Sequence, residues 1–450
     1  MEETTLTKTT QHRPWRTLNY NVKFVLIFVF SQSVGRGIWM GNVLSSYIYL
    51  ISDQSNELLG WTSAATGIMM TLVVFPAGVL ADHFRRDWIL RIASGVGIIS
   101  AFILFSADDL RQIIVALVFW GLYQGLTRPA LEALFADSVP SGTRSGIYSI
   151  RQFVEQGGMM IGPLINIILF WILGDEWELG ILKNVMSVGL IFSLISLGVM
   201  WFFKDKYSLG KKSESIISDP RELQAETQPE PIIEQESMQE NTLRKSKSSR
   251  FRLQRHQIPY VLVGCNIIIG LGAGMTIKFF PIFFMEVYSM QPILVQFINM
   301  FTFMATGILG LVAQQLSKRK GRAQMIFGVQ SLATICLAYI ATYPPFFPLI
   351  IIFIARGALM NASQPLSRSI LMDIVPKEKR GKWNSLEALA WGLFWNVSAV
   401  IGGYLIGSGN NFRLNFLVTA GIYVLGTLPL IALFNVVSDE THPNKDAHIA

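Results

Sequence analysis

Charged residues and cysteines are scarce in this chain of 450 residues. Only 15% of the residues are Asp, Glu, Lys or Arg, and the two cysteines, Cys265 and Cys336, both lie inside apolar runs. This placement excludes a secreted scaffold held together by disulfides. The chain has no Gly-x-x-x-x-Gly-Lys-Ser/Thr loop, so we expect it not to hydrolyse ATP. Because no metal-ligand cluster and no nucleophile with a base partner stands out, we predict no catalytic residue, no metal and no cofactor.

Long apolar segments occupy most of the chain. Hydrophobic residues make up 51% of it and the mean hydropathy is +0.42. Runs of about 18 apolar residues or more recur, and each is long enough to cross roughly 30 Å of hydrocarbon, which excludes a soluble enzyme. We predict twelve membrane spans. They cover residues 24–50, 60–80, 88–106, 113–136, 147–173, 182–203, 259–288, 293–316, 324–342, 346–371, 384–407 and 414–436.

The distribution of Lys and Arg indicates the orientation. If the N-terminus is cytoplasmic, the cytoplasmic segments hold basic runs such as Arg85–Arg86 and 318–322, whereas the outer loops keep few basic residues. This asymmetry predicts that both termini are cytoplasmic. It also accounts for the net charge of +7 without nucleic acid as a partner. No cleavable leader is expected, because the first apolar stretch continues past Arg36, and the kind of membrane stays open.

A polar segment divides the spans into two sets of six. Between Lys204 and Gln257 the chain is first acidic and then basic, and it contains three prolines. Such a segment cannot bury enough apolar area to offset its ordering entropy, so we expect disorder there. The predicted organisation is an N-terminal six-helix bundle over 1–203, a disordered cytoplasmic linker over 204–257, a C-terminal six-helix bundle over 258–437 and a cytoplasmic tail over 438–450.

The two halves resemble each other in sequence. Asp137-Ser-Val-Pro-Ser-Gly-Thr-Arg144 matches Asp373-Ile-Val-Pro-Lys-Glu-Lys-Arg380 at an offset of 236 residues. The same offset aligns a glycine and a proline of the fourth span with those of the tenth. This repeat indicates an internal duplication, which is typical of transporters that alternate access to a site near the membrane midplane.

The loop between the second and third spans carries a family motif. Residues 78–87 read GVLADHFRRD, with arginine where a second glycine is usual and aspartate at a usual basic position. Residues 158–163 read GMMIGP, which is similar to the glycine-proline motif of the drug/proton antiporter branch. On these motifs the chain resembles the major facilitator superfamily over essentially its whole length. The resemblance implies an all-α membrane protein with twelve transmembrane helices in two pseudo-symmetric six-helix bundles. It also implies a cavity lined by spans one, four, seven and ten.

Charges inside the spans need a physical reason, because a charge at the bilayer centre costs about 3 kcal/mol or more. Arg36, Lys278 and Arg356 fall near the middle of spans one, seven and ten, with no carboxylate at similar depth except Glu155. Unpaired cations in a low dielectric are unfavourable, so we expect these three to bind an organic anion or a zwitterion. Alternatively, Glu155 neutralises one cation and the ligand is neutral or cationic. Four aromatic residues are predicted to line the same site: Trp120, Tyr123, Trp391 and Trp395.

The seventh span is expected to break or bend around Lys278. Residues 270–284 combine three glycines, which permit bending, with Pro281, which removes a backbone donor. A break beside a charged residue supports a binding role for this span.

Charges toward the cytoplasmic ends of the spans predict a gate and a proton site. Glu155 is the deepest carboxylate and is our candidate for proton coupling. The resemblance and the internal repeat assign gating to ten further charged residues: Asp82, Arg86, Glu132, Asp137, Arg144, Arg151, Arg368, Asp373, Arg380 and Glu387. We expect their charge-assisted bonds to stabilise the state closed on the cytoplasmic side. The alternative is that the basic residues of the loops only enforce orientation.

The spans, the repeat and the buried charges predict a secondary transporter that moves a small organic solute by alternating access. Its expected partners are the solute, the lipid bilayer and protons, without nucleic acid, and we expect a monomer. Two alternatives stay open: an exporter of neutral or cationic compounds that resembles drug/proton antiporters, and a membrane receptor or sensor that keeps the fold without transporting. The sequence leaves the substrate, the direction and the coupling ion undetermined.

Overall fold

Every regular element in the described part of the chain is a helix. The computed structural model describes residues 18–139, 144–209, 257–375, 383, 386 and 390–434. Eleven of its helices are long and apolar enough to cross a membrane, and a shorter apolar helix covers Gly392–Ile406. The prediction of an all-α membrane protein with twelve spans is therefore confirmed.

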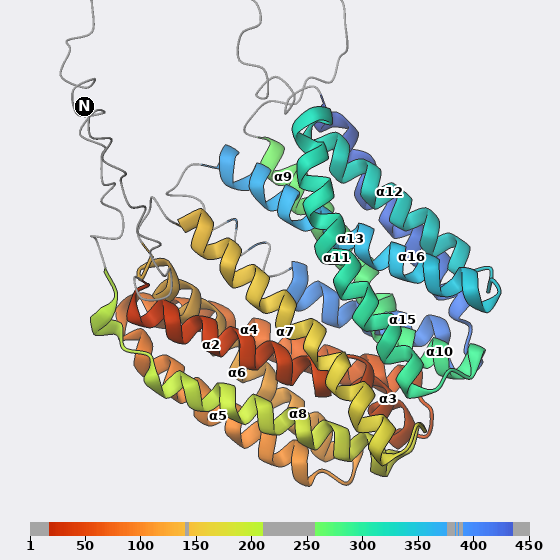
Figure 1. The fold of residues 1–450 in the computed structure, drawn as a ribbon, viewed down its shortest axis with the longest axis horizontal. Coiled ribbons are helices and arrows are strands. Elements are labelled where there is room, and N and C mark those ends of the chain that lie inside the picture. Colours follow the sequence, from red (N-terminus) through yellow and green to blue (C-terminus); the bar gives the residue numbers. More distant parts are fainter. Residues whose placement is uncertain are drawn as a thin grey trace, which may run out of the picture.

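The helices form two groups (Figure 1). The first group comprises α2 (Tyr20–Trp39), α3 (Asn42–Ile51), α4 (Asn56–His83), α5 (Arg86–Ser106), α6 (Leu110–Ala136), α7 (Arg144–Leu173) and α8 (Leu179–Val199), followed by the short turns η2 (Met200–Phe202) and η3 (Asp205–Tyr207). The second comprises α9 (Ile258–Thr276), η6 (Ile277–Phe279), α10 (Phe280–Tyr288), α11 (Pro292–Lys320), α12 (Arg322–Ile340), α13 (Phe346–Ile374), the π-helical turn η8 (Ala390–Phe394), α15 (Trp395–Ile406), α16 (Phe412–Thr427) and η9 (Leu428–Leu433). We call these groups the first half and the second half.

The sequence repeat is also a structural repeat. Equivalent helices begin 236 residues apart: α4 and α11 at Asn56 and Pro292, α5 and α12 at Arg86 and Arg322, and α6 and α13 at Leu110 and Phe346. The breaks correspond too, since α2 and α3 separate at Gly41, whose φ is 83°, and α9 and α10 separate at η6. The predicted break in the seventh span is thus confirmed.

The two halves meet at one end of the helices. We call the end at which α2 begins the near end, and the opposite end the far end. At the far end Asn56 Nδ2 donates to Gly407 O at 3.0 Å and to Asn410 Oδ1 at 2.8 Å. The backbone N–H of Ile293 donates to Asp175 Oδ1 at 2.8 Å in the same region. These bonds join α4 to the end of α15 and the end of α7 to the start of α11, so the far end is closed.

The halves diverge toward the near end (Figure 1). The contact between α4 and the second half reaches Met70, which lies so close to Gly392 that a Cβ there would strike the Met70 Cε. Beyond that point Leu72, Phe75 and Val79 are exposed. The two halves therefore contact each other at the far end and are farther apart at the near end.

Gly274 allows α9 and α15 to cross closely, because a Cβ there would collide with the Trp395 carbonyl oxygen and the Ser398 hydroxyl. Overpacking a tight contact typically costs about 1–3 kcal/mol. We expect Gly274→Val to lower the midpoint of thermal unfolding of the purified protein, measured by its intrinsic fluorescence. The control is Gly264→Val on the same helix, where an added Cβ meets nothing within 4 Å. Equal losses in both variants would contradict a special role for Gly274.

Candidate functional site

The structure places the three midspan cations in two locations. Arg36 on α2 and Lys278 in η6 belong to opposite halves, and the charge of Arg36 acts on Lys278. Arg356 on α13 lies instead in a separate pocket of the second half. Among the described residues, none of the three forms an ion pair with a carboxylate. Each is thus a cation without a direct counter-ion in that part of the chain.

Arg36 and Lys278 belong to a positively charged patch between the halves. Arg36 is half-buried, and its Nε has no hydrogen-bond partner among the residues that the structure describes. Its charge also acts on Arg128, which projects from α6. Lys278 is half-buried in the turn where the seventh span breaks. Three like charges thus lie near one another where the two halves face each other.

A cavity of about 180 Å³ surrounds Arg356 between α9 and α13, with α12 and α16 behind it. We call it the Arg356 pocket. It is lined by Asn266, Ile269, Ala273, Ile277, Gln330, Arg356, Gly357, Met360, Asn361, Ser363, Gln364, Ser367, Arg368, Trp395 and Tyr423. Gln330, Ser363 and Tyr423 are buried, whereas Asn361 and Arg368 are exposed. The pocket therefore has a buried floor and an exposed rim.

Arg356 is held on the floor by contacts that do not neutralise it. Its side chain is 4% exposed. Nη2 donates to the Tyr423 hydroxyl at 3.2 Å, and the guanidinium lies 4.9 Å from the centroid of the Phe280 ring, as in a cation–π contact. Gly272 makes room for this arrangement, because a Cβ there would lie 2.7 Å from the Tyr423 ring. The buried Nε has no partner among the described residues, so one donor of the guanidinium is unsatisfied.

Trp120 and Tyr123 lie in the core of the first half and not in the Arg356 pocket. Both are buried, and Trp120 packs 5.0 Å from Trp39 and 4.8 Å from Tyr123 between ring centroids. A solute does not reach them in this state. Trp120 precedes Arg356 by the repeat offset of 236 residues, so rings fill the first half where the second half has a charged pocket. Of the other predicted aromatics, Trp395 lines the pocket and the Trp391 side chain lies outside the described part.

Glu132 and Arg151 form a two-pronged ion pair within the first half. Arg151 donates from Nη1 and Nη2 to the two Glu132 oxygens at 2.8 and 2.5 Å, linking α7 to α6. The charge of Arg368, on α13 of the other half, also acts on Glu132. Glu155 acts on both Arg151 and Arg128. Three of the predicted gate residues, Glu132, Arg151 and Arg368, therefore lie in one region with the predicted proton site Glu155.

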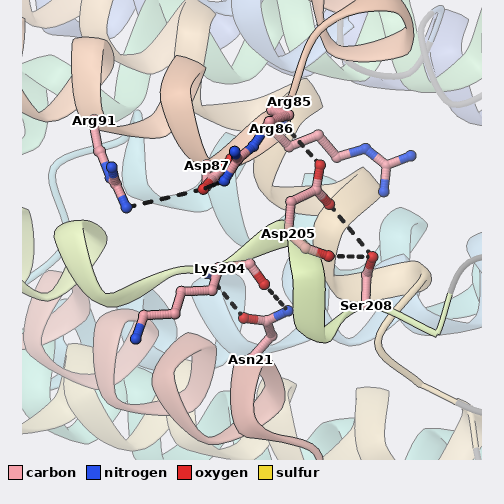
Figure 2. A network of polar contacts seen from close by, with 8 residues as sticks. All are labelled: Asn21, Arg85, Arg86, Asp87, Arg91, Lys204, Asp205 and Ser208. Atoms are coloured by element: carbon pink, nitrogen blue, oxygen red, sulfur yellow. Dashed lines mark hydrogen bonds and ion pairs between the residues drawn. The ribbon is translucent and has the colours of Figure 1, made fainter.

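A second network fastens the near end of the first half (Figure 2). Arg86 Nη1 donates to Asp137 Oδ2 at 2.5 Å, which joins the start of α5 to the end of α6. Arg85 forms a two-pronged pair with the buried Asp87 at 2.8 and 3.2 Å, and this bond raises the pKa of the Arg85 guanidinium above its ordinary value. Asp205 accepts from the backbone N–H of Arg86 at 3.2 Å and so caps α5.

The first residues of the predicted linker belong to this network. Lys204 and Asn21 exchange two hydrogen bonds of 3.0 and 3.2 Å, and the Leu209 N–H donates to the Asp137 carbonyl at 2.7 Å. Residues 204–209 are thus an ordered strap across the near end. The remaining predicted gate positions, namely Arg380, Glu387 and the side chains of Asp82, Arg144 and Asp373, lie outside what the structure describes.

In the described part of the chain, eleven membrane-length apolar helices and one shorter apolar helix form two related halves that meet at one end, which is the architecture of a polytopic membrane protein. The family model of the Major Facilitator Superfamily matches residues 25–256 and 262–449, and the chain belongs to this family. The protein therefore transports small solutes and is not an enzyme.

Similar proteins share the fold at low sequence identity. Myo-inositol transporter 1A of Cryptococcus neoformans var. grubii is 25% identical over 182 residues, which are 38% of this chain and 32% of that protein, so the match spans about a third of its length. The nucleoside transporter NupG aligns with a TM-score of 0.63 at 13% identity, covering 92% of this chain and 99% of that one. The D-xylose-proton symporter aligns with a TM-score of 0.63 at 16% identity, covering 91% and 96%. An inward-facing, occupied bacterial homologue of the human lysosomal transporter Spinster aligns at 0.66 and 12%, covering 96% and 99%.

Proposed function

We propose that this protein is a secondary transporter for a small organic solute that carries an anionic group. The observation that carries the proposal is Arg356, which lines a polar pocket, is 4% exposed, has a buried Nε without a partner and has no carboxylate partner among the described residues. Leaving a buried cation uncompensated is costly, and a bound anion removes that cost. An arginine can also bind a carboxylate or phosphate with two parallel hydrogen bonds.

The pair Arg36 and Lys278 supports alternating access by the same solute. These cations belong to opposite halves and act on each other. Bringing the halves together at the near end concentrates the positive charge, which is unfavourable without an anion. An anionic solute between the halves would offset this repulsion and favour closure. The solute would thus bind the two states with different affinities, which is what shifts their populations.

Uptake into proteoliposomes tests the proposal. The probes are matched anionic, neutral and cationic solutes of similar size, with liposomes lacking the protein as the control. We expect saturable uptake of the anionic members only. Uptake of cations in preference to anions would instead favour an exporter of the drug/proton antiporter kind. Binding without uptake would favour a receptor with the transporter fold.

We also propose that the near end faces the cytoplasm, on the basis of the basic residues at that end. In a background where Cys265 and Cys336 are replaced by serine, we expect Asp109→Cys at the far end to react with an impermeant maleimide in sealed right-side-out cells. Lys206→Cys, in the near-end strap, is expected to react only after permeabilisation. Labelling of Lys206→Cys in sealed cells would reverse the orientation.

Glu155 remains our candidate for proton coupling. It is half-buried, and its charge acts on Arg128 and Arg151. If Glu155 carries the transported proton, Glu155→Gln should abolish the stimulation of uptake by an imposed pH gradient but keep solute exchange at equal pH. Glu178→Gln, at an exposed position before α8, is the control. A normal response of Glu155→Gln to the gradient would exclude this role.

A further inference from the structure

The Arg356 pocket has a polar wall of amides and hydroxyls that a bare anion does not use. Gln330 Nε2 donates to the Ser363 hydroxyl at 3.2 Å, and its Oε1 accepts from Thr427 at 3.4 Å, so this buried amide is fixed at both ends. Asn266 Nδ2 donates to the Ser367 hydroxyl at 3.3 Å across α9 and α13. The wall is therefore organised before any ligand enters.

The pocket is also two-sided. Gly357, Asn361, Gln364 and Arg368 follow one another along a single face of α13, because their spacing matches the helical repeat. The lining residues of α9 and η6 are mainly apolar, namely Ile269, Ala273 and Ile277. Trp395 adds an aromatic surface. A ligand in this space meets hydrogen-bonding groups on one side and apolar surface on the other.

These features select a chemical class. Carboxamides and hydroxyls both donate and accept, as the hydroxyls of a sugar or cyclitol do. The C–H face of such a ring suits an apolar and aromatic surface. Beyond its bond to the Gly357 carbonyl, Asn361 has a second Nδ2 proton and the acceptor Oδ1, and ligand hydroxyls can pair with both, whereas the ring of a non-hydroxylated anion cannot. The volume of about 180 Å³ lies below the roughly 300–1,000 Å³ typical of sites for drug-sized ligands, which favours a single ring.

We infer that the Arg356 pocket binds a small hydroxylated organic anion of the sugar-acid or sugar-phosphate class. Arg356 holds the carboxylate or phosphate, while the wall around Gln330 and Asn361 binds the hydroxyls. This inference rests on the proposed function and deepens it. The shared chemistry is one anionic group on a ring of hydroxyls, and the experiment below separates its carboxylate and phosphate forms.

Calorimetric binding to the purified full-length protein tests the class. The probes are D-glucuronate, D-glucose 6-phosphate, neutral D-glucose and cyclohexanecarboxylate, a ring anion without hydroxyls. We expect one of the two hydroxylated anions to bind at least about tenfold more tightly than both glucose and cyclohexanecarboxylate. The preferred member of the pair identifies carboxylate or phosphate as the anionic group.

The other outcomes overturn different parts. Equal binding of cyclohexanecarboxylate and glucuronate overturns the hydroxyl inference but keeps the anionic solute of the proposed function. Equal binding of glucose and both hydroxylated anions overturns the proposal that the solute carries an anionic group. Binding of none of the four overturns the assignment of the pocket to this class.

A substitution at the rim of the Arg356 pocket tests whether the hydroxyls of the ligand bind there. Asn361 is exposed at the rim, and its Nδ2 donates to the Gly357 carbonyl at 3.0 Å. We expect Asn361→Leu to weaken binding of the preferred hydroxylated anion about tenfold, with the cyclohexanecarboxylate affinity within about twofold of wild type. Gln315→Leu, an exposed amide on α11 outside the pocket, is the matched control. Equal losses of affinity for both ligands in Asn361→Leu would show that Asn361 does not bind the hydroxyls.

Discussion

Replacing Arg356 with lysine is expected to weaken binding of the anionic solute about ten- to a hundredfold, although the charge is kept. A hydrogen bond to a charged group is worth about 1.5–3 kcal/mol, and each 1.4 kcal/mol is a factor of ten. Lysine cannot offer the planar two-pronged geometry. It also loses the stacking on Phe280 and the contact with the Tyr423 hydroxyl. Arg356→Lys should therefore lose affinity for the solute even though the positive charge is kept.

The measurement is the dissociation constant of the anionic probe for purified wild-type and Arg356→Lys protein. Arg413→Lys is a matched control, because the Arg413 guanidinium also lies over an aromatic ring, at 5.1 Å from the Tyr343 centroid, and its Nε donates to a backbone carbonyl. It lies far from the pocket at the start of α16, so its affinity should stay within about twofold of wild type. An unchanged dissociation constant in Arg356→Lys would remove Arg356 from the binding site.

The architecture followed from the sequence because its determinants are local. Apolar length gives each span, and the offset of 236 residues between Pro129 and Pro365 also separates the starts of α6 and α13. The break near Lys278 was predictable from glycines and a proline in one short segment. Arg356 is likewise recognisable from the sequence as a candidate functional residue, because it is a charged residue inside an apolar span.

The composition of the pocket was not predictable in the same way. Gln330 and Tyr423 come from α12 and α16, which correspond to the ninth and twelfth predicted spans and are not among the four spans expected to line the cavity. A single uncharged polar residue in an apolar span carries little signal, and only packing shows that both face Arg356. Aligning Trp120 with Arg356 indicates that the halves differ at this position, so that Trp120 need not share a site with Arg356.

The tertiary structure determines that Arg36 and Lys278 act on each other across the two halves, and that Arg356 lies in a pocket of the second half. Similar depth in three spans suggested one shared site. Depth fixes the position along the membrane normal but not which helix face a side chain occupies, and so it cannot tell a cleft between halves from a pocket within one half. The structure places Arg36 and Lys278 on opposite halves with their charges acting on each other, and Arg356 in a pocket of the second half.

Glu132→Gln is expected to slow uptake of the anionic solute about tenfold while changing its binding affinity by less than about twofold. The Glu132 side chain is 49% exposed in the state described, so its pair with Arg151 contributes about 1 kcal/mol at most to that state. Closing the near end would bring α13 and Arg368 toward Glu132 and remove water from the pair. The same charge then stabilises the closed state more strongly, because desolvated pairs interact more strongly than exposed ones. Glu132→Gln is therefore expected to slow the closing of the near end, and with it uptake, without changing the affinity for the solute.

A double-mutant cycle identifies the partner of Glu132 during closure. If Glu132 bonds to Arg368 when the near end closes, uptake by Glu132→Gln combined with Arg368→Gln should be no slower than that of the more impaired single variant. Effects that multiply would mean that the two residues act independently. The same cycle with Arg151→Gln, measured as thermal stability of the purified protein, reports the pair already formed within the first half. Coupling to Arg368 in uptake, together with coupling to Arg151 in stability, would mean that one carboxylate exchanges arginines as the transporter changes state. Coupling to Arg151 in both measurements would make Glu132 a fixed brace between α6 and α7.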